Sequence, residues 1–156
     1  MILKPEKVNT PEVVTQIRGF VAPAWVVIAF GQKLGKALLA EQFAINLHAS
    51  LLPRWRGAAP IHASILGGDT MTGNSVITLA DRMDAGLVLG TTQRAIPPEV
   101  TAGEMHDILA ADGPEVVLEV LDKHLQGQFE GASQDESLVT LASKFTKADG
   151  YIDCLL

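Results

Sequence analysis

The residues best suited to chemistry lie in the stretch INLHASLLPRWRGAAPI, residues 45–61. Asn46 and His48 are two positions apart at the end of an apolar segment, so on a strand their side chains leave the same face. A carboxamide can donate a hydrogen bond to a developing negative charge, and an imidazole can carry a proton near neutral pH. The same spacing also fits a structural pair, in which Asn46 satisfies a turn amide and His48 is a hydrogen-bonded residue at a strand end.

The loop after this pair is stiff. Pro53 and Pro60 each fix a φ angle, and Gly57 permits a close backbone approach or a positive φ. Rigid backbone next to exposed polar groups lowers the ordering cost of binding a ligand. A well-ordered surface loop without a ligand explains the same composition equally well.

The flanking segments predict how this pair is positioned. Residues 24–30 are continuously apolar and rich in β-branched side chains, which is typical of a strand buried on both faces of a helix-covered parallel sheet. Residues 43–47 predict a second strand, and residues 34–42 and 58–66 predict helices. In an open α/β sheet, ligands bind at the carboxyl ends of the strands, which is where Asn46 and His48 fall.

Beyond residue 69 the pattern changes to a pair of strands. Residues 75–79 and 87–95 alternate or run apolar, and the connection between them contains Asp81, Asp84 and Gly86. This pattern predicts two strands joined by a hairpin or a longer loop. An aspartate before Ala-Gly is commonly a turn former, so position alone assigns Asp84 no chemistry.

The last third of the chain predicts helix and then linker. Thr101 and Glu104 form a capping box, and an apolar helical face follows. Asp112-Gly113-Pro114 predicts an interruption before a second helical face that reaches residue 125. Residues 127–137 are polar and contain glycine, which indicates a linker.

Composition sets the broad class. The chain has 156 residues, of which 47% are hydrophobic and 19% charged, as expected for one globular domain. The net charge of −6 gives no bulk attraction for nucleic acid. The single cysteine, Cys154, cannot form an internal disulfide, and the apolar runs are too short to span a bilayer. We therefore expect a cytoplasmic protein without a membrane contact.

One combination of motifs resembles a known family. Asn46-x-His48-x-Ser-Leu-Leu-Pro, followed by Arg56-Gly57, is similar to the signature of the folate-dependent formyltransferases. The extension over residues 54–61 resembles the members that act on methionyl-tRNA more than those that act on glycinamide ribonucleotide. Met83-Asp84-Ala85-Gly86 matches the family's downstream aspartate motif. Residues 136–140 and Ile152-Asp153 resemble the family's exit from its catalytic domain.

The resemblance implies an α/β, Rossmann-like fold with a mostly parallel sheet that lacks the family's amino-terminal strands. Residues 1–137 would be a catalytic-domain portion, and residues 138–156 a tail or the start of a linker to a further domain. The exposed sheet edge would be covered by the family's amino-terminal half or by a dimer. The implied co-substrate is 10-formyltetrahydrofolate, with no metal. The implied acceptor, methionyl initiator tRNA, would bind weakly to so acidic a chain.

The resemblance also assigns roles. Asn46 would donate to the formyl oxygen, His48 would move the proton, and Asp84 would hold a charged His48 or position a relaying water. The residues expected to line the folate pocket are Ser50, Leu51, Leu52, Pro53, Arg56 and Gly57.

Three functions stay open at this point. The first is formylation of methionyl-tRNA, and the second is hydrolysis of formyl-tetrahydrofolate or formyl transfer to a sugar or nucleotide amine. The third is a folate-binding or interaction fragment without turnover. The sequence also departs from the family pattern, since Leu87 stands where a second acid is frequent and Cys154 where a tryptophan is common.

Overall fold

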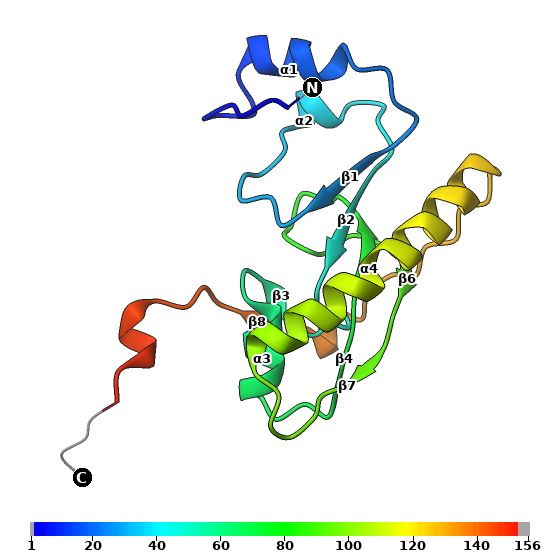
Figure 1. The fold of residues 1–156 in the computed structure, drawn as a ribbon. Coiled ribbons are helices and arrows are strands. Elements are labelled where there is room, and N and C mark those ends of the chain that lie inside the picture. Colours follow the sequence, from blue (N-terminus) through cyan, green and yellow to red (C-terminus); the bar gives the residue numbers. More distant parts are fainter. Residues whose placement is uncertain (1, 153–156) are drawn as a thin grey trace.

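A computed structural model describes residues 2–152 of the chain (Figure 1). Two short 3-10 helices, at Glu136–Leu138 and Lys147–Gly150, accompany the helices and strands. The helices and strands are α1 (Pro11–Arg18), β1 (Trp25–Ile28), α2 (Lys36–Leu39), β2 (Ala44–His48), β3 (Arg56–Gly57), α3 (Pro60–Leu66), β4 (Met71–Thr72), β5 (Ser75–Thr78), β6 (Val88–Thr91), β7 (Arg94–Ala95), α4 (Ala102–Leu125) and β8 (Leu141–Ala142).

The main sheet has four strands in the order β1-β2-β5-β6. β1 and β2 are parallel, whereas β5 pairs antiparallel with both β2 and β6. The predicted α/β class is confirmed. The mostly parallel pairing is confined here to β1 and β2, because the short connection over residues 79–87 leaves β5 and β6 only the antiparallel arrangement. The smaller pairs are β3 with β8, which is parallel, and β4 with β7, which is antiparallel.

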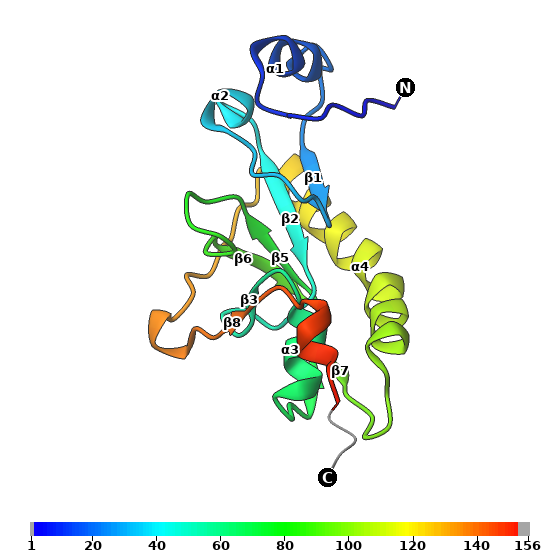
Figure 2. The same cartoon turned by 90° about the vertical axis from the view of Figure 1, so that its left-hand side faces the viewer.

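Helix α4 covers one face of this sheet, as Figure 2 shows. Thr101 begins it with the predicted capping box: the Thr101 hydroxyl accepts from the Glu104 amide, and the Glu104 carboxylate accepts from the Thr101 amide. Side chains of α4 then form the core with two strands, and that cluster comprises Ile45, Val76, Val116, Val117 and Val120.

The predicted interruption of this helix is wrong. α4 runs without a break through Asp112-Gly113-Pro114. A proline inside a helix removes one backbone hydrogen bond at a cost of about 3 kcal/mol. Packing offsets that cost, because α4 buries side chains on both sides of Pro114, among them Leu109 and Val116. Gly113 also lies so close to Leu47 that a Cβ would stand 2.6 Å from Leu47 Cδ2.

Burial of β1 on both faces is also wrong. Val26 and Ile28 lie beside Ile45 and Leu47 of β2, on the face that α4 covers. They nevertheless remain 40% and 58% exposed. The reason is that α4 packs mainly on β5 and β6 and leaves β1, at the opposite edge of the sheet from β6, largely uncovered.

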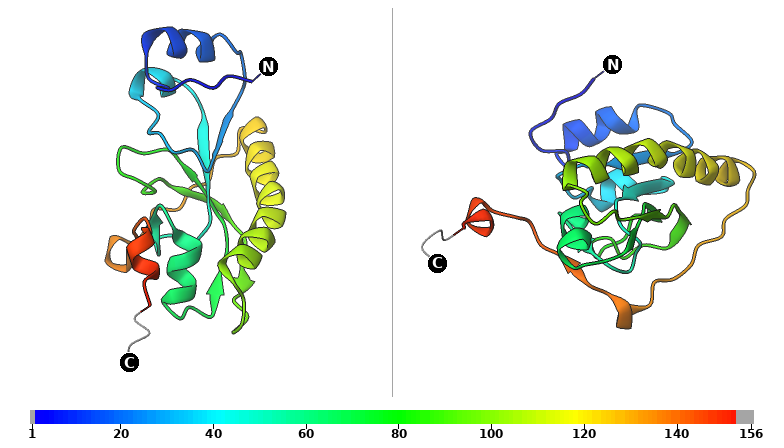
Figure 3. Two further views of the ribbon diagram at one scale, coloured as in Figure 1. Left: turned by 60° about the vertical axis from the view of Figure 1, so that its left-hand side comes forward. Right: turned by 60° about the horizontal axis from the view of Figure 1, so that its bottom comes forward.

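The predicted linker is packed against the domain. Val88 and Ala132 exchange two backbone hydrogen bonds of 2.9 Å each, which places residues 131–134 along β6. β8 then lies beside β3, and the chain leaves the body of the domain after it (Figure 3). Among residues 2–152, no helix has the length and apolar character needed to cross a membrane. Asp153 and Cys154 lie outside the described residues.

Candidate functional site

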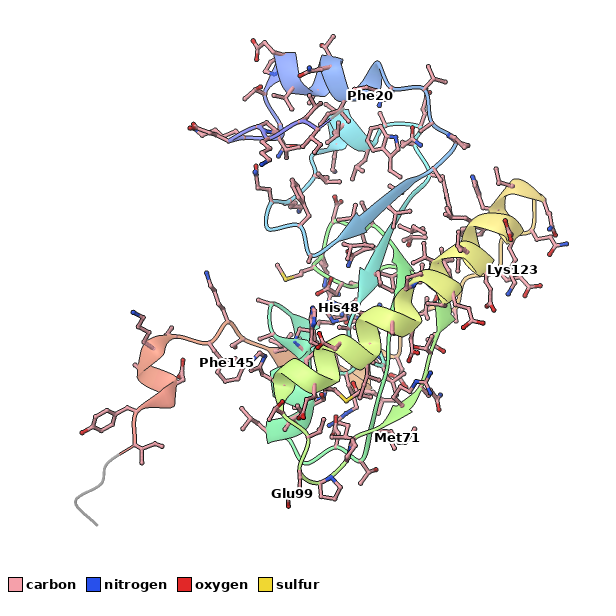
Figure 4. All side chains as sticks on the ribbon, in the orientation of Figure 1. Phe20, His48, Met71, Glu99, Lys123 and Phe145 are labelled. Atoms are coloured by element: carbon pink, nitrogen blue, oxygen red, sulfur yellow. The ribbon has the colours of Figure 1, made fainter. Side chains whose placement is uncertain are left out.

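His48 is the last residue of β2 and lies near the tip of that strand (Figure 4). Since Ile45 and Leu47 pack toward α4, the alternation of the strand turns His48 to the opposite face. The imidazole is buried, with 6% exposure, and its Nε2 lies 2.9 Å from the carbonyl oxygen of Trp55. A carbonyl can only accept, so Nε2 carries a hydrogen and Nδ1 is the nitrogen left to gain or lose a proton.

Asp84 meets His48 across the site. Its Oδ2 lies 3.6 Å from His48 Nδ1 and accepts a 2.9 Å hydrogen bond from the Gly57 amide. An ionised carboxylate can only accept, so Asp84 Oδ2 is placed as the acceptor for a hydrogen on His48 Nδ1. The structure thus brings together two residues that lie 36 positions apart in the sequence.

Asn46 lies two residues before His48 on β2, so the two side chains are on the same face of the sheet. Its neighbour across the sheet is Ile77 of β5, and its side chain is half-buried. Within residues 2–152 its carboxamide makes no hydrogen bond, so both its donor and its acceptor remain available. Asn46 therefore shares the face of β2 on which His48 approaches Asp84.

The SLLP turn, residues 50–53, is held by hydrogen bonds to Arg54 and to Ser75 of β5. The Ser50 hydroxyl donates to the Arg54 carbonyl at 2.7 Å, and the Ser50 carbonyl accepts from the Ser75 hydroxyl at 2.7 Å. The Leu52 amide donates to the Ser75 hydroxyl at 3.1 Å, and the Leu52–Pro53 peptide is cis. The Ser50 side chain is thus used inside the protein, and only backbone and apolar groups of the turn are left to face a ligand.

The Arg56 side chain is buried against other protein groups, whereas contact with a ligand requires an accessible side chain. It is 3% exposed, its Nε donates to Gln134 Oε1 at 2.9 Å, and its Nη2 donates to Glu136 Oε1 at 2.9 Å. The guanidinium thus uses its Nε and Nη2 donors on protein side chains. The hydrogen bonds from Arg56 first, and from Arg82 second, lower the pKa of the Glu136 carboxyl.

Gly57 contributes its backbone. Its φ of 130° favours glycine, and a Cβ there would stand 2.4 Å from the Ala142 carbonyl oxygen. This conformation turns the Gly57 amide to Asp84.

Sequence reasoning missed Gln134, which it assigned to a linker. Gln134 Nε2 donates to the carbonyl oxygens of Asp84 and Gly86, both at 2.8 Å. Neither periodicity nor a motif marks a single glutamine in a polar segment, so only the tertiary structure reveals this contact.

A cavity of about 250 Å³ lies between Leu51, Arg54 and Trp55 on one hand and residues 69–72 on the other, and Asn46, His48 and Asp84 do not line it. Trp55 Nε1 donates to Asp69 Oδ2 at 2.6 Å on its wall, and the Arg54 guanidinium lies over the indole ring. The part of the chain that the structure describes contains no group of three or more His, Cys, Asp or Glu side chains arranged to hold a metal ion.

Comparison with known proteins gives a consistent result. A family model described as formyl transferase matches residues 2–121. The methionyl-tRNA formyltransferase of Chlamydia pneumoniae is 39% identical over 153 residues, and that of Geotalea daltonii is 41% identical over 154 residues. These matches cover 97% of this chain but 48% and 49% of the relatives, so the chain spans about half their length.

Solved structures resemble this fold as well. HypX from Aquifex aeolicus in complex with tetrahydrofolic acid superposes with a TM-score of 0.81 over 92% of this chain and 25% of that one, at 16% identity. Phosphoribosylglycinamide formyltransferase from Bacillus halodurans superposes with a TM-score of 0.67 over 73% of this chain and 60% of that one, at 26% identity.

Proposed function

The chain belongs to the formyl transferase family, and from that premise we propose that it carries the reaction centre for moving a formyl group from 10-formyltetrahydrofolate to the amino group of methionyl initiator tRNA. The observation behind this proposal is the 3.6 Å approach of Asp84 to His48, on the sheet face that Asn46 shares. Relatives named methionyl-tRNA formyltransferase, 36% to 41% identical, support this acceptor over a sugar or nucleotide amine.

The reaction needs one bond formed, one broken and one proton moved. The amine nitrogen attacks the formyl carbon, the bond from that carbon to the folate nitrogen breaks, and the proton lost by the amine reaches the folate nitrogen. His48 suits this transfer through Nδ1, because its Nε2 already donates to the Trp55 carbonyl. Asp84 stabilises the imidazolium while it carries the proton.

Negative charge develops on the formyl oxygen during attack. The Asn46 carboxamide has no partner within residues 2–152 and can donate to that oxygen from a fixed strand. A preorganised donor of this kind lowers a barrier by roughly 3–4 kcal/mol. The turn over Ser50, Leu51, Leu52 and Pro53 would wall the folate pocket through its backbone.

We propose that additional chain pairs with the open edge of β1. Among the described strands β1 pairs only with β2, and Val26 and Ile28 expose apolar surface beside that edge. An uncovered edge strand of this kind recruits a further strand. Either a longer polypeptide or a second copy of the chain can supply it, and sedimentation equilibrium distinguishes the two: a dimer favours the second copy, and a monomer the longer polypeptide.

The wider assignment follows from the same premise. Residues 1–137 form the catalytic-domain portion, residues 138–156 are a tail or the start of a linker to a further domain, and the compartment is the cytoplasm. With a net charge of −6, the chain binds tRNA weakly by itself.

The test measures transfer of a labelled formyl group from 10-formyltetrahydrofolate to methionyl-tRNA by the chain and by two variants, His48→Ala and Asp84→Ala. We expect each variant to lose at least about 100-fold in turnover, because each removes a group that acts in the transition state. Circular dichroism checks that both variants remain folded.

Three results argue against the proposal. Near-normal turnover by either variant removes that residue from its role. Transfer to a sugar or nucleotide amine, or to water, in place of methionyl-tRNA changes the acceptor. Folate binding without transfer to any acceptor supports the alternative of a binding fragment without turnover.

A further inference from the structure

Gln134 holds the turn that carries Asp84. Both hydrogens of its amide are used, in 2.8 Å bonds to the carbonyl oxygens of Asp84 and Gly86, and its Oε1 accepts from Arg56 Nε at 2.9 Å. We propose that Gln134 is a positioning residue that keeps the Asp84 carboxylate within reach of His48. The catalytic part of this inference rests on the proposed function, whereas the positioning part does not.

Asp84 needs an external restraint. It has a φ of 51°, in the left-handed region that a residue with a side chain occupies at a cost of about 1–2 kcal/mol. A turn held against such a cost relaxes unless other contacts fix it. Relaxation of the Asp84 backbone would swing its carboxylate away from Nδ1 of His48, which it now approaches to 3.6 Å.

A ring of contacts includes the Asp84 carboxylate: it runs from Asp84 through Gln134, Arg56 and Gly57 and back to Asp84. Gln134 binds the backbone of Asp84 on one side and the guanidinium of Arg56 on the other. The residue after Arg56 is Gly57, whose amide donates to Asp84 Oδ2 at 2.9 Å. One carboxamide therefore binds both the backbone of Asp84 and the residue that precedes the donor to its side chain.

The ring is anchored to the rest of the domain. The paired hydrogen bonds between Val88 and Ala132 fix the segment that presents Gln134. Glu136 also holds Arg56, because its Oε1 accepts a 2.9 Å hydrogen bond from Arg56 Nη2. Since Arg56 is 3% exposed, loss of its partner would leave a buried charge short of one acceptor.

Gln134→Glu separates the contact with Arg56 from the contacts with the turn that carries Asp84. Glutamate keeps an oxygen for Arg56 but cannot donate to the carbonyls of Asp84 and Gly86 while ionised. The matched control is Gln16→Glu, the same chemical change on the exposed surface of α1. A second variant, Gln134→Met, removes every hydrogen bond of the carboxamide without adding charge.

The first readout is hydrogen exchange of the Gly57 amide, followed by NMR on the full chain without substrate. We expect both Gln134 variants to speed this exchange at least about fivefold, the equivalent of one lost hydrogen bond of average strength. Exchange at Ile45 and Val76, which are completely buried, serves as the fold control and stays unchanged. Gln16→Glu leaves all three amides as they are.

The second readout is the kinetics of formyl transfer. We expect kcat to fall by about 100-fold in Gln134→Glu, the scale of a 1 Å misplacement of a reacting group, with KM within about twofold. Fast Gly57 exchange together with a wild-type chain that transfers no formyl group supports the positioning role and refutes the proposed function. Unchanged Gly57 exchange in both variants overturns the inference. Uniformly faster exchange at Gly57, Ile45 and Val76 in both variants overturns it too, since Gln134 would then stabilise the fold in general.

Discussion

Gly57→Ala perturbs the backbone on which Asp84 depends. The new methyl group would stand 2.4 Å from the Ala142 carbonyl oxygen, closer than real Cβ atoms approach. The alanine would also have to adopt a φ of 130°. Either β8 retreats from β3, or the chain near Gly57 changes conformation and withdraws its amide from Asp84.

The magnitude follows from the contacts at risk. Strain at such a φ costs about 1–3 kcal/mol. Retreat of β8 breaks the 2.9 Å bonds from the Arg56 amide to the Thr140 carbonyl and from the Ala58 amide to the Ala142 carbonyl, worth about 1 kcal/mol each. We therefore expect the free energy of unfolding to fall by roughly 3–5 kcal/mol, a large part of the 5–15 kcal/mol that domains commonly have.

Urea denaturation followed by tryptophan fluorescence measures this loss. The control is Gly68→Ala, where φ is 71° and the space for a Cβ is open, so that only strain of about 1–2 kcal/mol applies. Hydrogen exchange at Arg56 and Ala58 reports whether β8 has separated. Equal losses in the two variants, with native exchange at both amides, would refute the steric argument.

Three further changes test other parts of the structure by urea denaturation. Gly90→Val adds a side chain whose Cβ alone would stand 2.9 Å from a methyl group of Val116, so overpacking should cost about 1–3 kcal/mol, and no loss would contradict the close packing of β6 on α4. Thr101→Ala removes the hydroxyl that accepts from the first turn of α4 and should cost about 1 kcal/mol, whereas an unchanged urea midpoint would show that the cap contributes nothing. Glu136 has a lowered pKa, so its contribution is full above its ordinary value of 4.5 and is lost as the pH falls through the lowered folded value. Glu136→Gln should therefore lower stability at pH 7 and flatten the acid loss below about pH 4.5, and parallel pH profiles would argue against the pairing with Arg56.

The local features were readable from the sequence because they depend on neighbours along the chain. The capping box at Thr101 and Glu104 needs only residues three positions apart. Asn46 and His48 share a face because strand geometry alternates with period two. The strand pair β5 and β6 was predicted from the apolar pattern of residues 75–79 and 87–95, and the antiparallel pairing was added by the structure.

The errors arose where packing overrides a local rule. Pro114 stays inside α4 because the helix buries side chains on both sides of it. An apolar run such as that of β1 predicts burial, but burial requires another element on top, and α4 lies elsewhere. Pattern alone does not say which face a neighbour covers.

The sequence by itself determined the family motif, the shared face of Asn46 and His48, and the type of most elements. Only the tertiary structure decided that Asp84 reaches His48, that Arg56 faces inward and that Gln134 holds the turn. The physical reason is the separation along the chain over which each kind of interaction acts. Backbone periodicity and capping act over a few residues, whereas contacts across 27 to 80 positions form only when the sheet and its connections bring distant segments together.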